Sequence, residues 1–122
     1  MGVIIFNSQN EEDYVSCNWW NWRPTVELIR KTNLFNTETC DLLSSGFGDI
    51  SEEQTIIIVK FLEELLSDAD ADSRFLLNTE KTNEPDDFVF HKDDFTKNYS
   101  ATAPWLRTFV DFLKKSEGIR VS

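Results

Sequence analysis

The strongest constraint on the fold of this chain is a helix-start signal followed by a long apolar run. Ser51 and Gln54 stand at the spacing of a capping box, in which each side chain accepts a hydrogen bond from the other residue's backbone N–H. The following run, 56–66, begins with β-branched residues that favour strands. Its length and its polar positions nevertheless predict a helix over 52–67. Because its first half is apolar nearly all round, we expect this helix in the middle of the fold.

Proline, asparagine and glycine mark three further helices. Pro24 and Pro104 suit a first helical turn, where the missing N–H has no intrahelical partner. Asn36 is a favourable N-cap, and Gly46 suits the left-handed residue that ends a helix. We expect the helix over 52–67 to pack against the C-terminal helix and the tryptophan-rich segment before Pro24. The three predicted helices span 24–33, 37–45 and 104–116.

A small amount of antiparallel sheet completes the expected fold. Residues 2–6 and 14–17 are β-branched and aromatic and flank a polar turn, which predicts an N-terminal hairpin. Residues 88–90 and 119–121 are further strand candidates, the second as a short edge strand. Residues 75–99 fit both strand and helix spacing and stay open. The predicted fold class is therefore an α-rich α+β domain with about four helices and a small antiparallel β element.

Length and charge limit the kinds of protein that this chain can be. A chain of 122 residues without repeats or linker-like stretches predicts one compact domain over 1–122. Its 22 acidic and 12 basic side chains give a formal net charge of −10, which repels nucleic acid and anionic lipid. We therefore expect neither as a direct partner. No apolar run approaches the ~20 residues of a membrane span, and the N-terminus lacks a secretory signal, so the expected compartment is the cytoplasm.

Most of the net charge lies in one segment. Residues 63–94 contain 11 acidic and three basic side chains, a net charge of −8, whereas the other 90 residues carry −2. Concentrated like charge costs stability. One interpretation of this acidic segment is that it forms solvated loops. The other is that it forms a surface for a basic protein, because complementary potentials speed association. The candidate partner-binding residues are Glu63, Glu64, Asp68, Asp70, Asp72, Glu84, Asp86, Asp87, Asp93 and Asp94.

Three of the four tryptophans stand within four positions, at Trp19, Trp20 and Trp22. Tryptophan is enriched in binding hot spots, where its large ring buries much area. In an extended segment Trp20 and Trp22 would share one side and Trp19 would take the other. One interpretation is core packing. The alternative is a ligand or partner surface that uses one or two of these rings.

The signals for catalysis and metal binding are weak. His91 is the single histidine, so any histidine-dependent nucleophilic site must use it. The alternate aspartates of residues 68–72 are similar to the start of an EF-hand loop. However, Ser73 and Thr79 stand where that loop requires Gly and a bidentate Glu. We expect no catalytic residue, no metal site and no cofactor.

In general character the chain resembles bacterial immunity proteins, which neutralise toxins. The likeness is one of composition (small, acidic, rich in Trp and Phe) and carries no motif and no residue roles. The leading hypothesis is a non-enzymatic, immunity- or inhibitor-like module that binds a basic protein through residues 63–94. The first alternative is a small-ligand or carbohydrate-binding domain built on the tryptophans of residues 19–22. The second is an enzyme or metal protein that uses His91 or the aspartates of residues 68–72.

Overall fold

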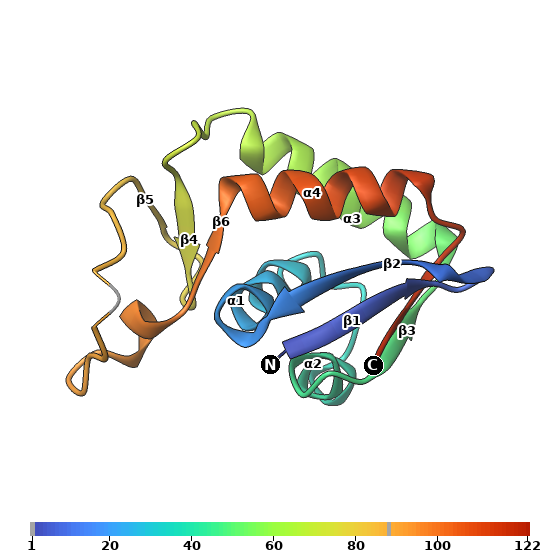
Figure 1. Cartoon of the computed structure of the whole chain (residues 1–122), viewed down its shortest axis with the longest axis horizontal. Helices are drawn as coiled ribbons and strands as arrows, with labels where there is room; N and C mark the ends of the chain where they lie inside the picture. Colours follow the sequence, from blue (N-terminus) through green and yellow to red (C-terminus); the bar gives the residue numbers. More distant parts are fainter. Residues whose placement is uncertain (1, 88) are drawn as a thin grey trace.

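Two antiparallel sheets and four helices make up the fold, which a computed structural model describes for residues 2–87 and 89–122 (Figure 1). The predicted α+β class is confirmed. The first sheet has the strand order β2-β1-β7-β3. These strands are β1 (Gly2–Asn7), β2 (Asn10–Asn18), β7 (Ile119–Val121) and β3 (Gly48–Ile50).

The N-terminal hairpin is confirmed and is longer than predicted. Its second strand begins at Asn10 and continues to Asn18. The predicted strand at residues 119–121 is also confirmed, but its expected place at an edge is wrong. β7 lies between β1 and β3 and pairs with both. β7 is therefore an interior strand of this four-stranded sheet, and β2 and β3 are its edge strands.

All four predicted helices are present. They are α1 (Trp19–Arg30), α2 (Thr37–Ser44), α3 (Glu52–Leu66) and α4 (Ala103–Lys115). The largest difference is at α1, which begins five residues before Pro24. Asn18 caps it, since its side-chain oxygen accepts a hydrogen bond from Asn21 N at 2.9 Å. The tryptophans of residues 19–22 therefore lie in the first turn of a helix, and the prediction of an extended segment there is wrong.

The local cap predictions are confirmed. Ser51 Oγ accepts from Gln54 N at 3.2 Å, and Gln54 Oε1 accepts from Ser51 N at 3.0 Å, which completes the capping box. Asn36 Oδ1 accepts from Thr39 N at 2.8 Å at the start of α2. Gly46 follows α2 with φ of 93°, the left-handed conformation expected there.

The expected central position of α3 is wrong. α3 packs against α4 (Figure 1), and the buried face of α3 includes Ile58 and Leu62. Ile56 and Ile57 remain 63% and 47% exposed. Successive helical residues are about 100° apart, so four consecutive apolar residues cannot all face one neighbour. α3 is therefore an outer, amphipathic helix.

The buried ring of the tryptophan segment packs on α4 and α2. Trp22 is fully buried, and its ring meets Phe109 of α4 edge-on at 5.9 Å. Its Nε1–H donates to the carbonyl of Leu43, in α2, at 2.8 Å. Of the two interpretations of the tryptophan segment, core packing is confirmed for Trp22, whose neighbours in these contacts are Phe109 of α4 and Leu43 of α2.

Residues 74–102 contain a second sheet, which extends from the rest of the molecule (Figure 1). Its strand order is β5-β4-β6, formed by β4 (Arg74–Leu76), β5 (Lys81–Thr82) and β6 (Ser100–Thr102). A short 3-10 helix, η1 (Phe95–Asn98), precedes β6. Of the predicted strand 88–90, residue 88 lies outside the described residues, and Val89 and Phe90 are not in a strand. None of the described helices is both long and apolar enough to cross a membrane.

Candidate functional site

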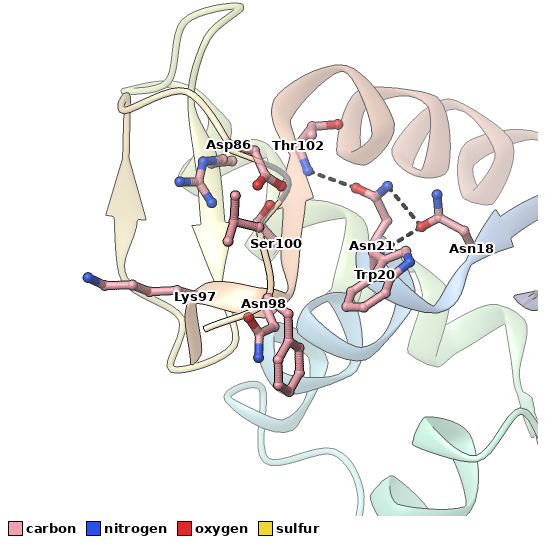
Figure 2. A pocket seen from close by; sticks show the side chains of 11 residues that line it. Asn18, Trp20, Asn21, Asp86, Lys97, Asn98, Ser100 and Thr102 are labelled. Carbon is pink, nitrogen blue, oxygen red and sulfur yellow. Dashed lines mark hydrogen bonds between the residues drawn. The ribbon is translucent and has the colours of Figure 1, made fainter. Parts of the chain in front are cut away.

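A pocket of about 450 Å³ opens where the start of α1 meets the second sheet (Figure 2). Asn18, Trp20 and Asn21 line it from the α1 side. The opposite walls come from β4, β6, η1 and the loop between β5 and η1. The pocket therefore joins segments that are distant in the sequence.

Two asparagine side chains hold the α1 side of the pocket in place. Asn18 Oδ1 accepts from both the backbone N and the side-chain Nδ2 of Asn21, at 2.9 and 3.1 Å. Asn21 Oδ1 in turn accepts from the backbone N–H of Thr102 at 3.0 Å (Figure 2). This chain of hydrogen bonds connects the start of α1 to the end of β6, so both walls of the pocket are fixed relative to each other.

Trp20 lines the pocket with its ring, which also contacts Tyr99. Its ring packs against Tyr99 in a tilted arrangement, with centroids 4.9 Å apart and planes at 33°. The guanidinium of Arg23 lies over Tyr99 at 5.6 Å and over Trp19 at 5.3 Å, and it donates to the Tyr99 hydroxyl at 3.2 Å. Trp20 nevertheless stays 52% exposed. The neighbours thus hold the ring in position and leave part of it open to the pocket.

Further apolar side chains line the pocket from the loop before η1. Val89 and Phe90 are 60% and 59% exposed. The Phe90 ring meets Phe95 of η1 edge-on at 5.8 Å. Clustered exposed apolar groups are uncommon on soluble proteins unless they form a binding surface.

Charged groups of both signs also line the pocket. The cations are Arg74, from β4, and Lys97, from η1, and the anion is the half-buried Asp86. Arg74 Nε donates to the carbonyl of Glu84 at 2.8 Å. Its Nη1 is buried and has no hydrogen-bond partner. A buried donor without an acceptor costs free energy, so Arg74 is a lining side chain whose hydrogen bonding is incomplete.

The three candidate tryptophans separate in the structure. Only Trp20 lines the pocket. Trp22 belongs to the core, as the core-packing interpretation expected. Trp19 is half-buried, and its ring lies close to Gly46, where an added Cβ would come within 3.1 Å of it. On α1, Trp19 and Trp22 are three residues apart and lie on neighbouring sides, whereas Trp20 is about 100° from Trp19 and about 160° from Trp22, so the Trp20 ring faces a different side.

Two of the ten candidate acidic residues contact a basic side chain inside the molecule. Glu63 lies 2.9 Å from Lys114 of α4. Asp87 Oδ1 lies 3.0 Å from His91 Nε2. The pKa of Asp87 is lowered, first by the hydrogen bond from the backbone N–H of Val89 and then by His91.

Two others organise loops. Asp70 Oδ1 accepts from Asp72 N at 2.9 Å, and Asp70 Oδ2 accepts from Asn83 Nδ2 at 3.2 Å. Asp94 caps η1 by accepting from Thr96 N at 3.1 Å. The Thr96 hydroxyl also donates to Asp94 and is the main cause of its lowered pKa. These carboxylates have structural partners of their own.

Five candidates are exposed and have no ion pair within the described part of the chain: Glu64, Asp68, Asp72, Glu84 and Asp93. The hydrogen bond between Asp70 and Asn83 brings the turn at 68–72 beside the chain next to Glu84. Asp68 and Asp72, in this turn, therefore lie at the same end of the second sheet as Glu84. Asp86 differs from them, because it lines the pocket.

His91 helps to hold the loop beside the pocket. Its backbone N–H donates to Asn98 Oδ1 at 2.7 Å, and Asn98 Nδ2 donates back to the carbonyl of His91 at 3.2 Å.

Cys17 and Cys40 are buried, and burial raises the pKa of the Cys17 thiol to about 12. Within residues 2–87 and 89–122, no group of three or more His, Cys, Asp or Glu side chains could hold a metal ion.

Sequence reasoning missed most of the polar lining. Asn18 could have been found, because an asparagine before a run of bulky residues is an N-cap signal that also places Trp20 in a helical turn. Arg74 was visible as an isolated cation in an acidic segment. Lys97 and Thr102 carried no local signal, since only the second sheet brings them to α1.

No protein-family model, no curated protein and no solved structure matches this chain. The functional argument therefore rests on the geometry and the chemistry of the pocket and of the exposed acidic residues.

Proposed function

We propose that this protein is a small-ligand-binding domain whose site is the pocket around Trp20. The observation that supports this function is the combination, in about 450 Å³, of an exposed aromatic ring with fixed polar groups. Small-molecule sites are concave, measure roughly 300–1,000 Å³ and combine apolar walls with a few placed polar groups. The proposal develops the ligand-binding hypothesis for the tryptophan segment and narrows it to one ring.

The support of Trp20 favours a binding role over incidental exposure. Leaving half of a tryptophan ring in water forfeits much of its hydrophobic stabilisation. The stack of Arg23, Tyr99 and Trp20 holds this ring in one orientation while it stays exposed. Such pre-organisation lowers the entropy cost of binding a ligand.

Two-dimensional ¹H–¹⁵N NMR of the tryptophan indoles tests this function. The Trp22 and Trp105 indoles donate to Leu43 O and Thr25 Oγ1 at 2.8 and 2.9 Å, so they serve as internal references. Titration with aromatic acids, aromatic amides and monosaccharides should shift the Trp20 indole with at least one class, and leave Trp22 in place. A Trp20→Phe variant assigns the signal. If no class shifts Trp20 at millimolar concentration, the proposed function is wrong.

A second candidate function is the binding of a basic protein through the exposed acidic residues at the end of the second sheet. It is supported by Asp68, Asp72 and Glu84, which are exposed and unpaired in the described chain and lie near one another. Free carboxylates that share one surface would attract a cationic partner and make the complex sensitive to salt.

A comparison of charge variants tests this second candidate. The variant Asp68→Asn/Asp72→Asn/Glu84→Gln removes three charges from this surface. Its matched control, Glu12→Gln/Asp111→Asn/Glu117→Gln, removes three exposed charges elsewhere. We expect a cationic protein from the native host to be retained by the wild type and the control at low salt, and to be lost from the first variant and at 0.5 M salt (about a 4 Å screening length). Equal retention by both variants would exclude this surface.

A further inference from the structure

We propose that the ligand of the pocket is a small organic anion with one negative charge, a carboxylate attached to a flat apolar ring. This inference rests on the proposed function, because it names the class of molecule that the pocket binds. It is carried by a local excess of positive groups in a chain whose net charge is −10.

Arg74 is the main reason to expect an anion. Its Nε is satisfied by the carbonyl of Glu84, but its Nη1 is buried without an acceptor. Guanidinium donors form strong charge-assisted hydrogen bonds with carboxylate oxygens. A carboxylate in the pocket would supply the acceptor that the described residues do not provide.

The net charge of the lining favours one negative charge over two. Arg74 and Lys97 contribute two positive charges, and Asp86 contributes one negative charge. A monoanion neutralises the remaining positive charge. A dianion such as a phosphate monoester would leave an excess negative charge in a chain that is already acidic.

The positive ends of two helices add to the same potential. The N-cap residues of α1 and α4, Asn18 and Thr102, both line the pocket. Neither helix has an acidic side chain in its first turn, whereas α2 and α3 both do. The macrodipoles of α1 and α4 are therefore not compensated by their own side chains at this end, which favours an anion there.

The apolar walls define the other half of the ligand. Tyr99 supports the Trp20 ring from outside the pocket, so the exposed part of the ring is available for stacking. Val89 and Phe90 add further exposed apolar surface. A flat ring next to the carboxylate can bury this surface, and aromatic pairs gain additional stabilisation from stacking.

Calorimetric titration with four probes tests the class of ligand. We expect 2-naphthoate to bind about tenfold or more tightly than 2-naphthamide, because one charge-assisted hydrogen bond has about this effect. Acetate, which lacks the ring, and 2-naphthyl phosphate, which carries the second charge, should both bind more weakly than 2-naphthoate. If 2-naphthyl phosphate binds more tightly than 2-naphthoate, the inference that the ligand carries a single negative charge is wrong. If acetate binds more tightly than 2-naphthoate, the inference that the ligand carries an apolar ring is wrong.

The neutral amide separates the two proposals. Equal binding of 2-naphthoate and 2-naphthamide, with a shift of the Trp20 indole, would overturn the anion inference and leave the proposed function standing. If no probe here and no member of the wider panel shifts the indole, both are wrong.

Variants that remove single positive charges test which lining residue binds the carboxylate of 2-naphthoate. Arg74→Gln should weaken 2-naphthoate about tenfold and leave 2-naphthamide unchanged. Lys97→Gln, at an exposed position, tests the same inference should Arg74→Gln perturb the second sheet. Lys92→Gln is the matched control, since Lys92 is exposed in the loop just before η1 and does not line the pocket. Unchanged 2-naphthoate affinity in folded Arg74→Gln, or in Lys97→Gln where the first does not fold, would overturn the inference.

Discussion

Asn21 accepts a hydrogen bond from the backbone N–H of Thr102 at 3.0 Å, across 81 positions of the sequence. The same amide donates to Asn18, so one side chain connects the N-cap of α1 to the N-cap of α4. The two helix starts that border the pocket are therefore coupled through Asn21. Its position predicts that this residue affects both stability and ligand binding.

Replacement of Asn21 by Ala should lower the free energy of unfolding by about 1–2 kcal/mol, because it leaves the Thr102 N–H without its acceptor. Urea unfolding measures this change. The control Gln9→Ala, at an exposed residue of the β1–β2 turn, should remain within about 0.5 kcal/mol of wild type. A loss no larger than that of the control would show that the hydrogen bond does not stabilise the fold.

Asn21→Asp distinguishes stability from binding. The new carboxylate keeps an acceptor for Thr102 N, and its favourable interaction with the dipole of α1 offsets the hydrogen bond that Asn21 Nδ2 donates to Asn18 and that the variant loses. It also places a negative charge beside the pocket. We expect near-wild-type stability together with several-fold weaker binding of 2-naphthoate, measured by calorimetry. Unimpaired binding in a fully folded variant would contradict the electrostatic role of this end of α1.

The capping box should contribute measurably to the stability of α3. Ser51→Ala removes the acceptor for Gln54 N, which costs about 1 kcal/mol in comparable helices. Ser45→Ala is the matched control, because Ser45 is exposed after α2. Thermal and urea unfolding measure the stability of both variants. Equal stability of Ser51→Ala and Ser45→Ala would mean that water replaces the hydrogen bond of the cap without loss of stability.

The helices were predictable because their signals are local. Ser51 with Gln54, and Asn36 before α2, occupy fixed spacings that act within a few residues. The place of β7 depends instead on pairing with β1 and β3, which are far away in sequence. No local pattern distinguishes an interior three-residue strand from an edge strand, so the predicted edge position was wrong.

The candidate site was only partly predictable for the same reason. The sequence indicates Trp20 only together with Trp19 and Trp22, because the enrichment of tryptophan in binding sites depends on the residue type alone. The partners of Trp20 come from the second sheet and η1, whose boundaries the ambiguous spacing of residues 75–99 left open. Arg74 belongs to the site because its Nη1 is buried without a partner, a property that exists only in the folded chain.

Acid should destabilise the loop beside the pocket through Asp94. Its pKa is lowered in the folded state, chiefly by the Thr96 hydroxyl, from an ordinary value of 3.8. A lowered folded-state pKa gives a contribution that is present above the unfolded value and is lost as the pH falls through the folded value. The unfolding free energy should therefore decrease below about pH 4, less steeply in Asp94→Asn. Identical pH profiles of the two proteins would contradict this role of Asp94.

Both cysteines should resist thiol reagents in the native protein. Cys17 has a pKa raised to about 12 by burial, so almost no thiolate is present at pH 8. Cys40 is also buried, and burial is the first cause of its raised pKa. Ellman's reagent should react slowly with native protein and fully with two thiols in denaturant. Fast modification of one native thiol would show that the surrounding core opens readily.

The amphipathic placement of α3 predicts opposite outcomes for two adjacent isoleucines. Ile58 is fully buried, whereas Ile57 is 47% exposed. Ile58→Ala removes methyl groups from the packed core and should cost about 2–5 kcal/mol, because the cavity closes only in part. Ile57→Ala exchanges a half-exposed β-branched residue for the best helix former, so its smaller hydrophobic loss is partly offset by helix propensity.

Urea unfolding of these two variants therefore measures which face of α3 is inside. The matched pair has the same chemistry, the same helix and neighbouring positions, so only burial differs. We expect Ile57→Ala to cost less than half as much as Ile58→Ala. Equal, large losses at both positions would place α3 in the middle of the fold, as its uninterrupted apolar run had predicted, and would contradict the one-sided contact of α3 with α4.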